Sequence, residues 1–139
     1  MGAIRPLVVA AGLLAGACTS PSLVSCATAE VAQGCAVTTE LFLGLSRPDG
    51  TVLSDREWQG FLSDIVTPLF PDGFTVLVGD GQWRQPGTAD ISHEPSKVLM
   101  IVHNKPGDDD RITALIAAYK NSFLQESVLR VDLKSIVSF

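Results

Sequence analysis

The alternation of apolar and polar residues predicts four β-strands. Thr39 to Leu45 places a leucine at every second position, as a strand with one buried face does. A second strand is expected from Phe74 to Val78, and a third from Lys97 to His103. The third carries an unbroken apolar run from Val98 to Val102, which indicates burial on both faces. The last strand begins near Ser127 and alternates like a half-exposed edge strand.

Two helices are predicted between these strands. Ser54 and Glu57 have the spacing of a capping box, and apolar residues then recur at helical spacing as far as Leu69. Asp108-Asp109-Asp110 is typical of a solvated helix start, and an apolar stripe follows it from Ile112. The order βαββαβ predicts an α+β, ferredoxin-like fold, a four-stranded antiparallel sheet with both helices on one face.

The apolar third strand raises the question of what covers the face opposite the helices. Two helices on one side cannot bury both of its faces, and an open half-sheet would expose an apolar patch of several hundred Å². We expect a second copy of the chain to cover it, which makes the protein a homodimer. The alternative is that the segment before the domain folds back over the sheet, with Val31, Ala36 and Val37 in contact with it.

The N-terminal residues predict export. A short basic start to Arg5 and an uncharged apolar run from Leu7 to Leu14 precede small residues, so residues 1–17 are interpreted as a signal peptide. The small residues before Cys18 resemble a lipobox, in which the cysteine is lipidated and becomes the new N-terminus. Cleavage after Ala17 or Ala29 without a lipid is the alternative. Residues 18–37 are interpreted as a tether, and residues 38–139 as the folded domain.

The expected pairing of the cysteines depends on where the signal peptide is cleaved and on whether Cys18 is lipidated. If Cys18 is lipidated, Cys26 and Cys35 remain as an even pair in an oxidising compartment, and a disulfide between them is expected. Closing so short a loop would stabilise the fold by about 2 to 3 kcal/mol in the chain-entropy model. Cleavage after Ala29 would instead leave Cys35 without Cys26.

Length and charge exclude several functions. The 139 residues suffice for one domain, and 10 Lys and Arg against 15 Asp and Glu give a net charge of −5, which disfavours nucleic acid as a partner. The third strand lacks the aromatic residues of RNA-recognition modules. The first loop lacks the Cys-x-x-Cys of metal chaperones, and Gly79-Asp80-Gly81 is interpreted as a hairpin turn because no helix signal follows it.

Candidate chemistry is concentrated between the second and third strands. Trp83, Arg84 and Glu94, together with Arg130, are the residues we expect to contact a ligand. Glu94 stands just before a buried strand, where an unpaired carboxylate is costly, so Arg84 or Arg130 is expected to pair with it. His93, Glu94 and His103 could form a metal set, but histidines ten residues apart are more often surface and strand-end residues. No metal ion or other cofactor is expected.

Several segments together resemble a known family: ELFLGLSRPDG, EWQGFLSDIVTPLFPDG, GQWR, EPSKVLMIVH, AAYKNSF and QESVLRV. The resemblance is to the bacterial domain-of-unknown-function family 3574, small exported proteins often with lipoprotein-type signals. It covers nearly all of Leu41 to Arg130, and it implies a compartment without implying an activity.

The sequence therefore predicts an exported bacterial envelope protein, attached to a membrane through a lipid on Cys18. Its domain is expected to be a non-catalytic binding or dimerising module with an unidentified small ligand. The alternative is a cofactor-free enzyme on a dimeric ferredoxin-like scaffold, with Glu94 or His103 as general base.

Overall fold

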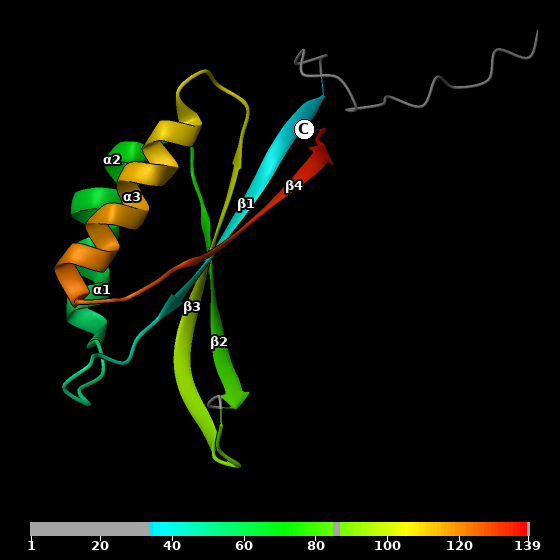
Figure 1. Ribbon diagram of the computed structural model, residues 1–139. Coiled ribbons are helices and arrows are strands. Elements are labelled where there is room, and N and C mark those ends of the chain that lie inside the picture. Colours follow the sequence, from blue (N-terminus) through cyan, green and yellow to red (C-terminus); the bar gives the residue numbers. More distant parts are fainter. Residues whose placement is uncertain (1–33, 85–86, 139) are drawn as a thin grey trace, which may run out of the picture.

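One antiparallel sheet organises the domain (Figure 1). The structure is a computed structural model, and it describes residues 34–84 and 87–138. The strands lie in the order β2-β3-β1-β4, and each helical segment crosses over one intervening strand. Their bounds are β1 (Cys35–Gly44), β2 (Thr75–Arg84), β3 (Ile91–His103) and β4 (Leu129–Ile136). The predicted α+β, ferredoxin-like arrangement is confirmed.

The first crossover is one helical segment with a widened middle. It comprises α1 (Asp55–Phe61), a π-helical turn (Leu62–Val66) and α2 (Thr67–Leu69). The predicted capping box is present, because the Ser54 amide donates to Glu57 Oε2 at 2.9 Å and the Glu57 amide donates to Ser54 Oγ. The π turn ends at Val66, two residues before Pro68, whose ring and missing N–H disrupt the regular i→i−4 hydrogen bonds of an α-helix interior.

The second crossover is α3 (Asp108–Phe123), and it packs beside the first on the same face of the sheet (Figure 1). Its N-cap is Gly107, which has a left-handed backbone with φ of 84° and provides no side-chain cap. Apolar side chains of α3 meet those of α1 over the central strands. This core contains the predicted helix residue Trp58, four further aromatic rings, and leucines and isoleucines of β1, β3 and α3: Phe61, Phe70, Tyr119, Phe123, Leu41, Leu43, Leu99, Ile101, Ile112 and Leu115.

The strands are longer than the apolar pattern predicts. β1 begins at Cys35, so the last three residues of the expected tether belong to the sheet. The expected turn at Gly79-Asp80-Gly81 is wrong, because these residues pair with Ser96, Pro95 and Glu94 inside a long β2–β3 hairpin. The backbone of Gly79 approaches the partner strand closely, since a Cβ there would lie 2.7 Å from Ser96 Oγ and the Ser96 side chain would have to shift.

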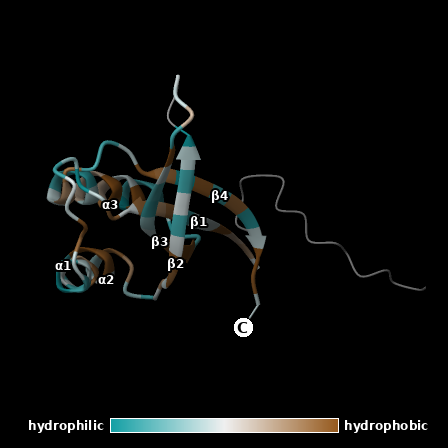
Figure 2. Cartoon of the chain, turned by 90° about the horizontal axis from the view of Figure 1, so that it is seen from below, coloured by the Kyte–Doolittle hydropathy of each residue, from teal (hydrophilic) through white to brown (hydrophobic). Residues whose placement is uncertain are grey.

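None of the described helices or strands covers the sheet face opposite the helices, as Figure 2 shows from below. Three rows of paired residues cross it. The first row is Leu77, Val98, Phe42 and Leu129; the second is Thr75, Met100, Glu40 and Val131; the third is Val102, Thr38 and Leu133. Leu77, Val102, Leu129 and Leu133 are each about half exposed or more. Within the described residues, no helix is long and apolar enough to cross a membrane.

Candidate functional site

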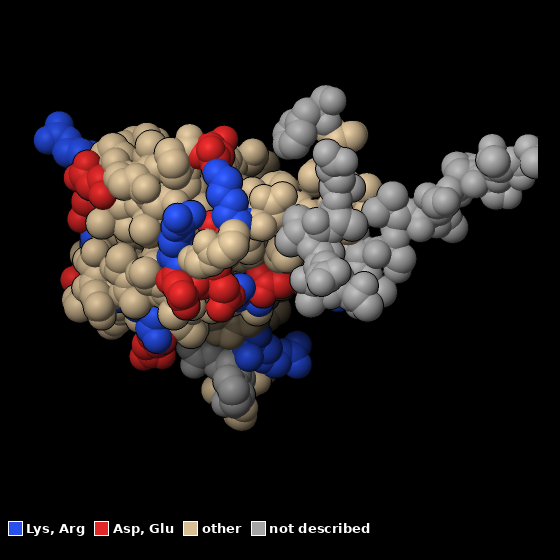
Figure 3. Space-filling view, turned by 90° about the horizontal axis from the view of Figure 1, so that it is seen from above, with Lys and Arg blue, Asp and Glu red and all other residues tan. Residues whose placement is uncertain are grey.

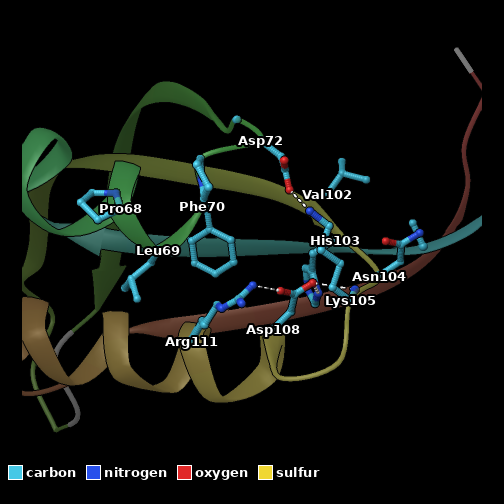
Figure 4. Close-up of a pocket in the computed structure, with 13 residues that line it drawn as sticks. Pro68, Leu69, Phe70, Asp72, Val102, His103, Asn104, Lys105, Asp108 and Arg111 are labelled. Carbon is cyan, nitrogen blue, oxygen red and sulfur yellow. Dashed lines mark hydrogen bonds and ion pairs between the residues drawn. The ribbon is translucent and has the colours of Figure 1, made fainter.

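A cavity of about 440 Å³ lies where β3 ends and α3 begins (Figure 4). Its apolar side consists of Pro68, Leu69 and Phe70 at the end of the first crossover. Its polar side combines Asp72 with residues from the end of β3 and the start of α3: His103, Asn104, Lys105, Asp108 and Arg111. Acidic and basic side chains are interspersed on the face of the molecule seen in Figure 3.

His103 is the titratable side chain at the centre of this arrangement, and it is only 10% exposed. Its Nε2 lies 2.8 Å from Thr39 Oγ1, and that hydroxyl donates its one proton to Asp132 Oδ1 at 2.6 Å. Thr39 must therefore accept from the ring, so Nε2 carries a proton. The other ring nitrogen, Nδ1, lies 3.6 Å from Asp108 Oδ2, beyond hydrogen-bond distance.

Asp108 lies on the opposite side of the ring. Its side chain is 5% exposed, and it accepts from the Lys105 amide at 2.7 Å and from Arg111 Nη1 at 2.8 Å. The prediction of a solvated acidic helix start is therefore wrong for this residue. The turn before α3 folds its carboxylate inward, where it closes the loop from Lys105 and pairs with Arg111.

Arg130 and Asp132 on β4 extend the same network away from the cavity. Arg130 Nε lies 2.9 Å from Asp132 Oδ2, and its Nη2 lies 2.5 Å from Asp109 Oδ1. Partial burial raises the pKa of Asp132, but hydrogen bonds from Thr39 and Arg130 outweigh that effect and leave the pKa below its ordinary value. We call the connected set Arg111, Asp108, His103, Thr39, Asp132, Arg130 and Asp109 the His103 network.

The structure does not bring the four expected ligand contacts together. Trp83 and Arg84 lie near the tip of the β2–β3 hairpin, paired with Ser92 and Ile91, and both are exposed. Glu94 lies further along β3, and Arg130 belongs to the His103 network. Among the described residues that line the cavity, none of the four is present.

Glu94 has a partner of a different kind from the one expected. Its Oε1 accepts from the Ser46 amide at 3.0 Å, and its carboxylate lies over Gly44, where a Cβ would come within 2.4 Å. In the described part of the chain no ion pair joins it to Arg84 or Arg130, so that predicted pairing is wrong. Alternation along the strands explains this, because Arg84 is opposite Ile91 and projects from the other face of the hairpin.

The same region contains a buried tyrosine. The Tyr119 hydroxyl donates to the Gly44 carbonyl at 2.7 Å, which fixes the end of β1 against α3. Burial raises the pKa of Tyr119 well above its ordinary value, and the nearby Glu94 carboxylate adds to the shift. Glu94, Gly44 and Tyr119 thus form a packing cluster that joins the hairpin, β1 and α3.

The remaining sequence candidates are distributed along the fold. His93 is exposed and pairs with Gln82, ten positions along the same strand from His103. The described residues contain no group of three or more histidine, cysteine, aspartate or glutamate side chains that could hold a metal ion. Cys35 is disulfide-bonded. Cys18 and Cys26 lie outside the described residues, so the Cys26–Cys35 pair and the lipid on Cys18 stay predictions.

Residues 38–139 match the family described as "Protein of unknown function (DUF3574)". The chain belongs to this family. The match includes the whole His103 network and the cavity apart from Ala36. No curated protein is significantly similar to the chain.

Solved structures share the fold of this DUF3574 domain at low sequence identity. A phage SAM lyase in complex with S-methyl-5'-thioadenosine has a TM-score of 0.56 and 15% identity, covering 71% of this chain and 81% of its own. Its apo form has a TM-score of 0.56 and 18% identity, over 79% and 90% of the two chains. CutA from Synechococcus elongatus PCC7942 has a TM-score of 0.47 and 10% identity, over 74% and 79%. The similarity to the phage SAM lyase shows the fold alone.

Sequence reasoning missed most of the cavity in this DUF3574 domain. It had singled out His103, but it gave no role to Thr39, Arg111 or Asp132 and treated Asp108 as a cap. One signal was present: Thr39 occupies an inward position in the alternation Val37, Thr39, Leu41, Leu43, where a polar residue needs a partner. The identity of that partner depends on strand pairing, which places Thr39 beside Ile101 and Asp132.

Proposed function

We propose that this protein is an exported, lipid-anchored bacterial envelope protein whose domain binds a small polar molecule in the cavity beside His103, without catalysis. One observation carries the binding proposal. His103 is nine-tenths buried, yet its Nδ1 lies at a cavity and makes no hydrogen bond within the described residues. No buried side-chain nitrogen or oxygen of the described residues lacks a hydrogen-bond partner, so Nδ1 is accessible from the cavity, where a ligand or water can bond to it.

The size and lining of the cavity support the same proposal. Its volume falls within the range of about 300 to 1,000 Å³ that is usual for small-molecule sites. It also has the usual division of such sites, with an apolar wall at Leu69 and Phe70 and a few converging polar groups opposite. Two of the polar groups are held in place, because Thr39 bonds to Nε2 of His103 and the Asp108 carboxylate accepts from the Lys105 amide and from Arg111.

Export and anchoring are supported by the N-terminal residues. A basic start, an apolar run and small residues precede Cys18 in the order expected of a lipoprotein signal. A lipid on Cys18 would leave the domain on a tether at the surface of a membrane. Intact mass of the membrane-extracted protein tests this, because the mature chain should begin at a lipidated Cys18. A chain that begins at Thr19 or Glu30, or an unmodified cysteine in soluble protein, would contradict the anchor.

The open sheet face supports a homodimer as part of this proposal. Its three rows contain one charged residue, Glu40, among mostly apolar side chains. A second copy presenting the same face would remove that apolar surface from water.

A proton-transfer enzyme is the second candidate, because one observation favours it. The proton on Nε2 leaves Nδ1 of neutral His103 as the basic nitrogen, and Asp108 would stabilise the imidazolium formed when Nδ1 takes a proton. Glu94 has no such position, since its carboxylate is bonded to the Ser46 amide outside the cavity. Non-catalytic binding is preferred because, among the described residues, the acidic and basic side chains nearest His103 already have partners.

Thermal denaturation of the protein with a panel of polar metabolites tests the binding proposal. The panel contains amino acids, carboxylates, amines and sugars. At least one compound should raise the melting temperature of the wild type. Leu69→Trp, which fills the apolar end of the cavity, should abolish that rise, whereas Leu133→Trp on the open sheet face should preserve it. The proposal is wrong if no compound stabilises the protein, or if Leu69→Trp responds like the wild type. Conversion of a stabilising compound by the wild type but not by His103→Gln would favour the enzyme.

A further inference from the structure

We infer that the ligand of the cavity is a small zwitterion of the α-amino acid type, with an ammonium group, a carboxylate and an apolar side chain. The inference rests on the proposed function and names the chemical class that the site selects. It follows from how the charges that line the cavity are paired.

The lining is charge-balanced before any ligand enters. Two carboxylates, Asp72 and Asp108, are matched by two cations, Lys105 and Arg111. Lys105 pairs with Asp72 at the rim, where their side chains are 57% and 75% exposed. Arg111 pairs with Asp108, whose carboxylate is buried. The rim pair is thus easily exchanged because solvent screens it, whereas the inner pair is held in place.

A ligand with a single charge can replace only one member of the rim pair. A carboxylate can take the place of Asp72 at Lys105, or an amine can take the place of Lys105 at Asp72. A zwitterion can replace both members at once, because its carboxylate can lie beside Lys105 while its ammonium group lies beside Asp72. Each charge of the protein then keeps an opposite charge beside it.

Arg111 adds selectivity for the carboxylate. Its side chain is 46% exposed, and the described hydrogen bonds engage only its Nη1, with Asp108. The remaining N–H groups of the guanidinium can donate to a carboxylate, often with two parallel bonds. Leu69 and Phe70 form the wall on which an apolar side chain of the ligand would pack.

Isothermal titration of the full protein with alanine, valine, leucine, methionine and phenylalanine tests the inference. At least one should bind. The N-acetyl derivative of the tightest binder keeps only the carboxylate. The derivative in which the carboxylate of the same amino acid is converted to an amide keeps only the ammonium group. Each derivative should bind at least about tenfold more weakly, the loss expected when one charged hydrogen-bonding group is removed.

Two variants and two controls locate the effect. Asp72→Asn should weaken binding of the amino acid, because it removes the carboxylate expected to pair with the ammonium group of the ligand. Lys105→Met should also weaken binding, because it removes the cation expected to pair with the carboxylate of the ligand. Both residues are exposed, so the fold should be preserved. The matched controls Asp80→Asn and Lys134→Met lie outside the cavity and should bind like the wild type.

The outcomes separate this inference from the proposed function. An N-acetyl amino acid that binds as tightly as the free amino acid overturns the zwitterion and leaves the cavity as a binding site. The same conclusion follows if only a sugar, an amine or a simple carboxylate stabilises the wild type and that stabilisation is lost in Leu69→Trp. Failure of every compound in both experiments overturns the inference and the proposed function together.

Discussion

At the scale of single residues, Thr39 joins the two halves of the His103 network. It is fully buried on β1, donates to Asp132 and accepts from His103. Thr39→Val keeps the shape of the side chain but leaves both partners unsatisfied, so it should lower the free energy of unfolding by about 1 to 3 kcal/mol. Thr38→Val is the matched control, because Thr38 bonds to Ser135 and projects from the opposite face. Urea denaturation measures both, and an equal small loss in the two variants would contradict the network.

Glu57 gives the domain a specific response to acid. Hydrogen bonds from the Ser54 side chain and backbone, and then from Arg47, lower the pKa of Glu57 from 4.5 to about 2. Because the folded pKa lies below the unfolded one, the stabilisation is present above about pH 4.5 and is lost as the pH falls towards 2. The melting temperature of the wild type should therefore fall more steeply over this interval than that of Glu57→Gln. Parallel profiles of melting temperature against pH for the two proteins would show that the capping box does not stabilise the charged form of Glu57.

The sequence predicts residues whose roles are local and misses those whose roles depend on pairing. Ser54 and Glu57 lie three positions apart, so their capping box follows from spacing alone. Thr39, His103 and Asp132 are far apart in the chain and meet only because β3, β1 and β4 are neighbours. Glu94 was correctly seen to need a partner, but a backbone amide is the same at every residue and leaves no signal in the sequence.

At the scale of elements, Gly44 and Glu94 fasten the β2–β3 hairpin to the end of β1. Gly44→Ala would place a Cβ within 2.4 to 2.8 Å of the Glu94 carboxyl atoms and displace it from the Ser46 amide. We expect a loss of about 1 to 3 kcal/mol in the free energy of unfolding. The loss should be smaller when Glu94 is already alanine, because the clash is then absent.

A double-mutant cycle by urea denaturation checks this coupling. Gly60→Ala is the control, because a Cβ at this helical glycine meets nothing within 4 Å and should be neutral or stabilising by up to about 1 kcal/mol. Additive losses for Gly44→Ala and Glu94→Ala would contradict a direct contact. Arg84→Ala in place of Gly44→Ala should show no coupling with Glu94.

The pattern predicts each element and misjudges where strands end. Apolar alternation stops near Val78, so the distal hairpin, with exposed Asp80, Gln82 and Arg84, gives no strand signal. Its strands persist because β2 and β3 pair through their backbones as far as Arg84 and Ile91. β1 likewise begins before the first residue of the predicted strand, since Cys35 pairs with Ile136.

At the scale of the whole molecule, the open sheet face predicts self-association. Four strands and three rows of residues cover on the order of 400 Å² in plan, near the largest apolar patch a monomer usually exposes. Two such faces together approach the roughly 1,000 Å² of a biological interface, so the dimer should be reversible. Leu77→Lys, in the all-apolar row, should raise the dissociation constant at least about tenfold.

Sedimentation equilibrium measures this prediction. Val52→Lys is the matched control, because Val52 is similarly exposed and lies away from the strands of the sheet. It should associate like the wild type. A wild type that remains monomeric at millimolar concentration, or equal effects of the two lysines, would contradict a dimer through this face.

The fold as a whole could be predicted because the spacing of apolar residues within each segment indicates whether that segment is a strand or a helix. The cavity could not, because it forms between the end of one crossover, the end of β3 and the start of the next crossover. These three segments carry turn residues such as Pro71, Gly73 and Gly107, whose sequence is typical of loops in general.

The central claim is that a small polar molecule binds beside His103. Backbone amide chemical shifts of the ¹⁵N-labelled protein test it most directly, recorded while the compound that most raises the melting temperature is added. The largest shifts should occur at the cavity residues at the end of β3, in the loop after it and at the start of α3: His103, Asn104, Lys105, Asp108 and Arg111. Shifts confined to the open sheet face, at Phe42, Leu77 and Leu133, or no shifts at saturating compound, would contradict it.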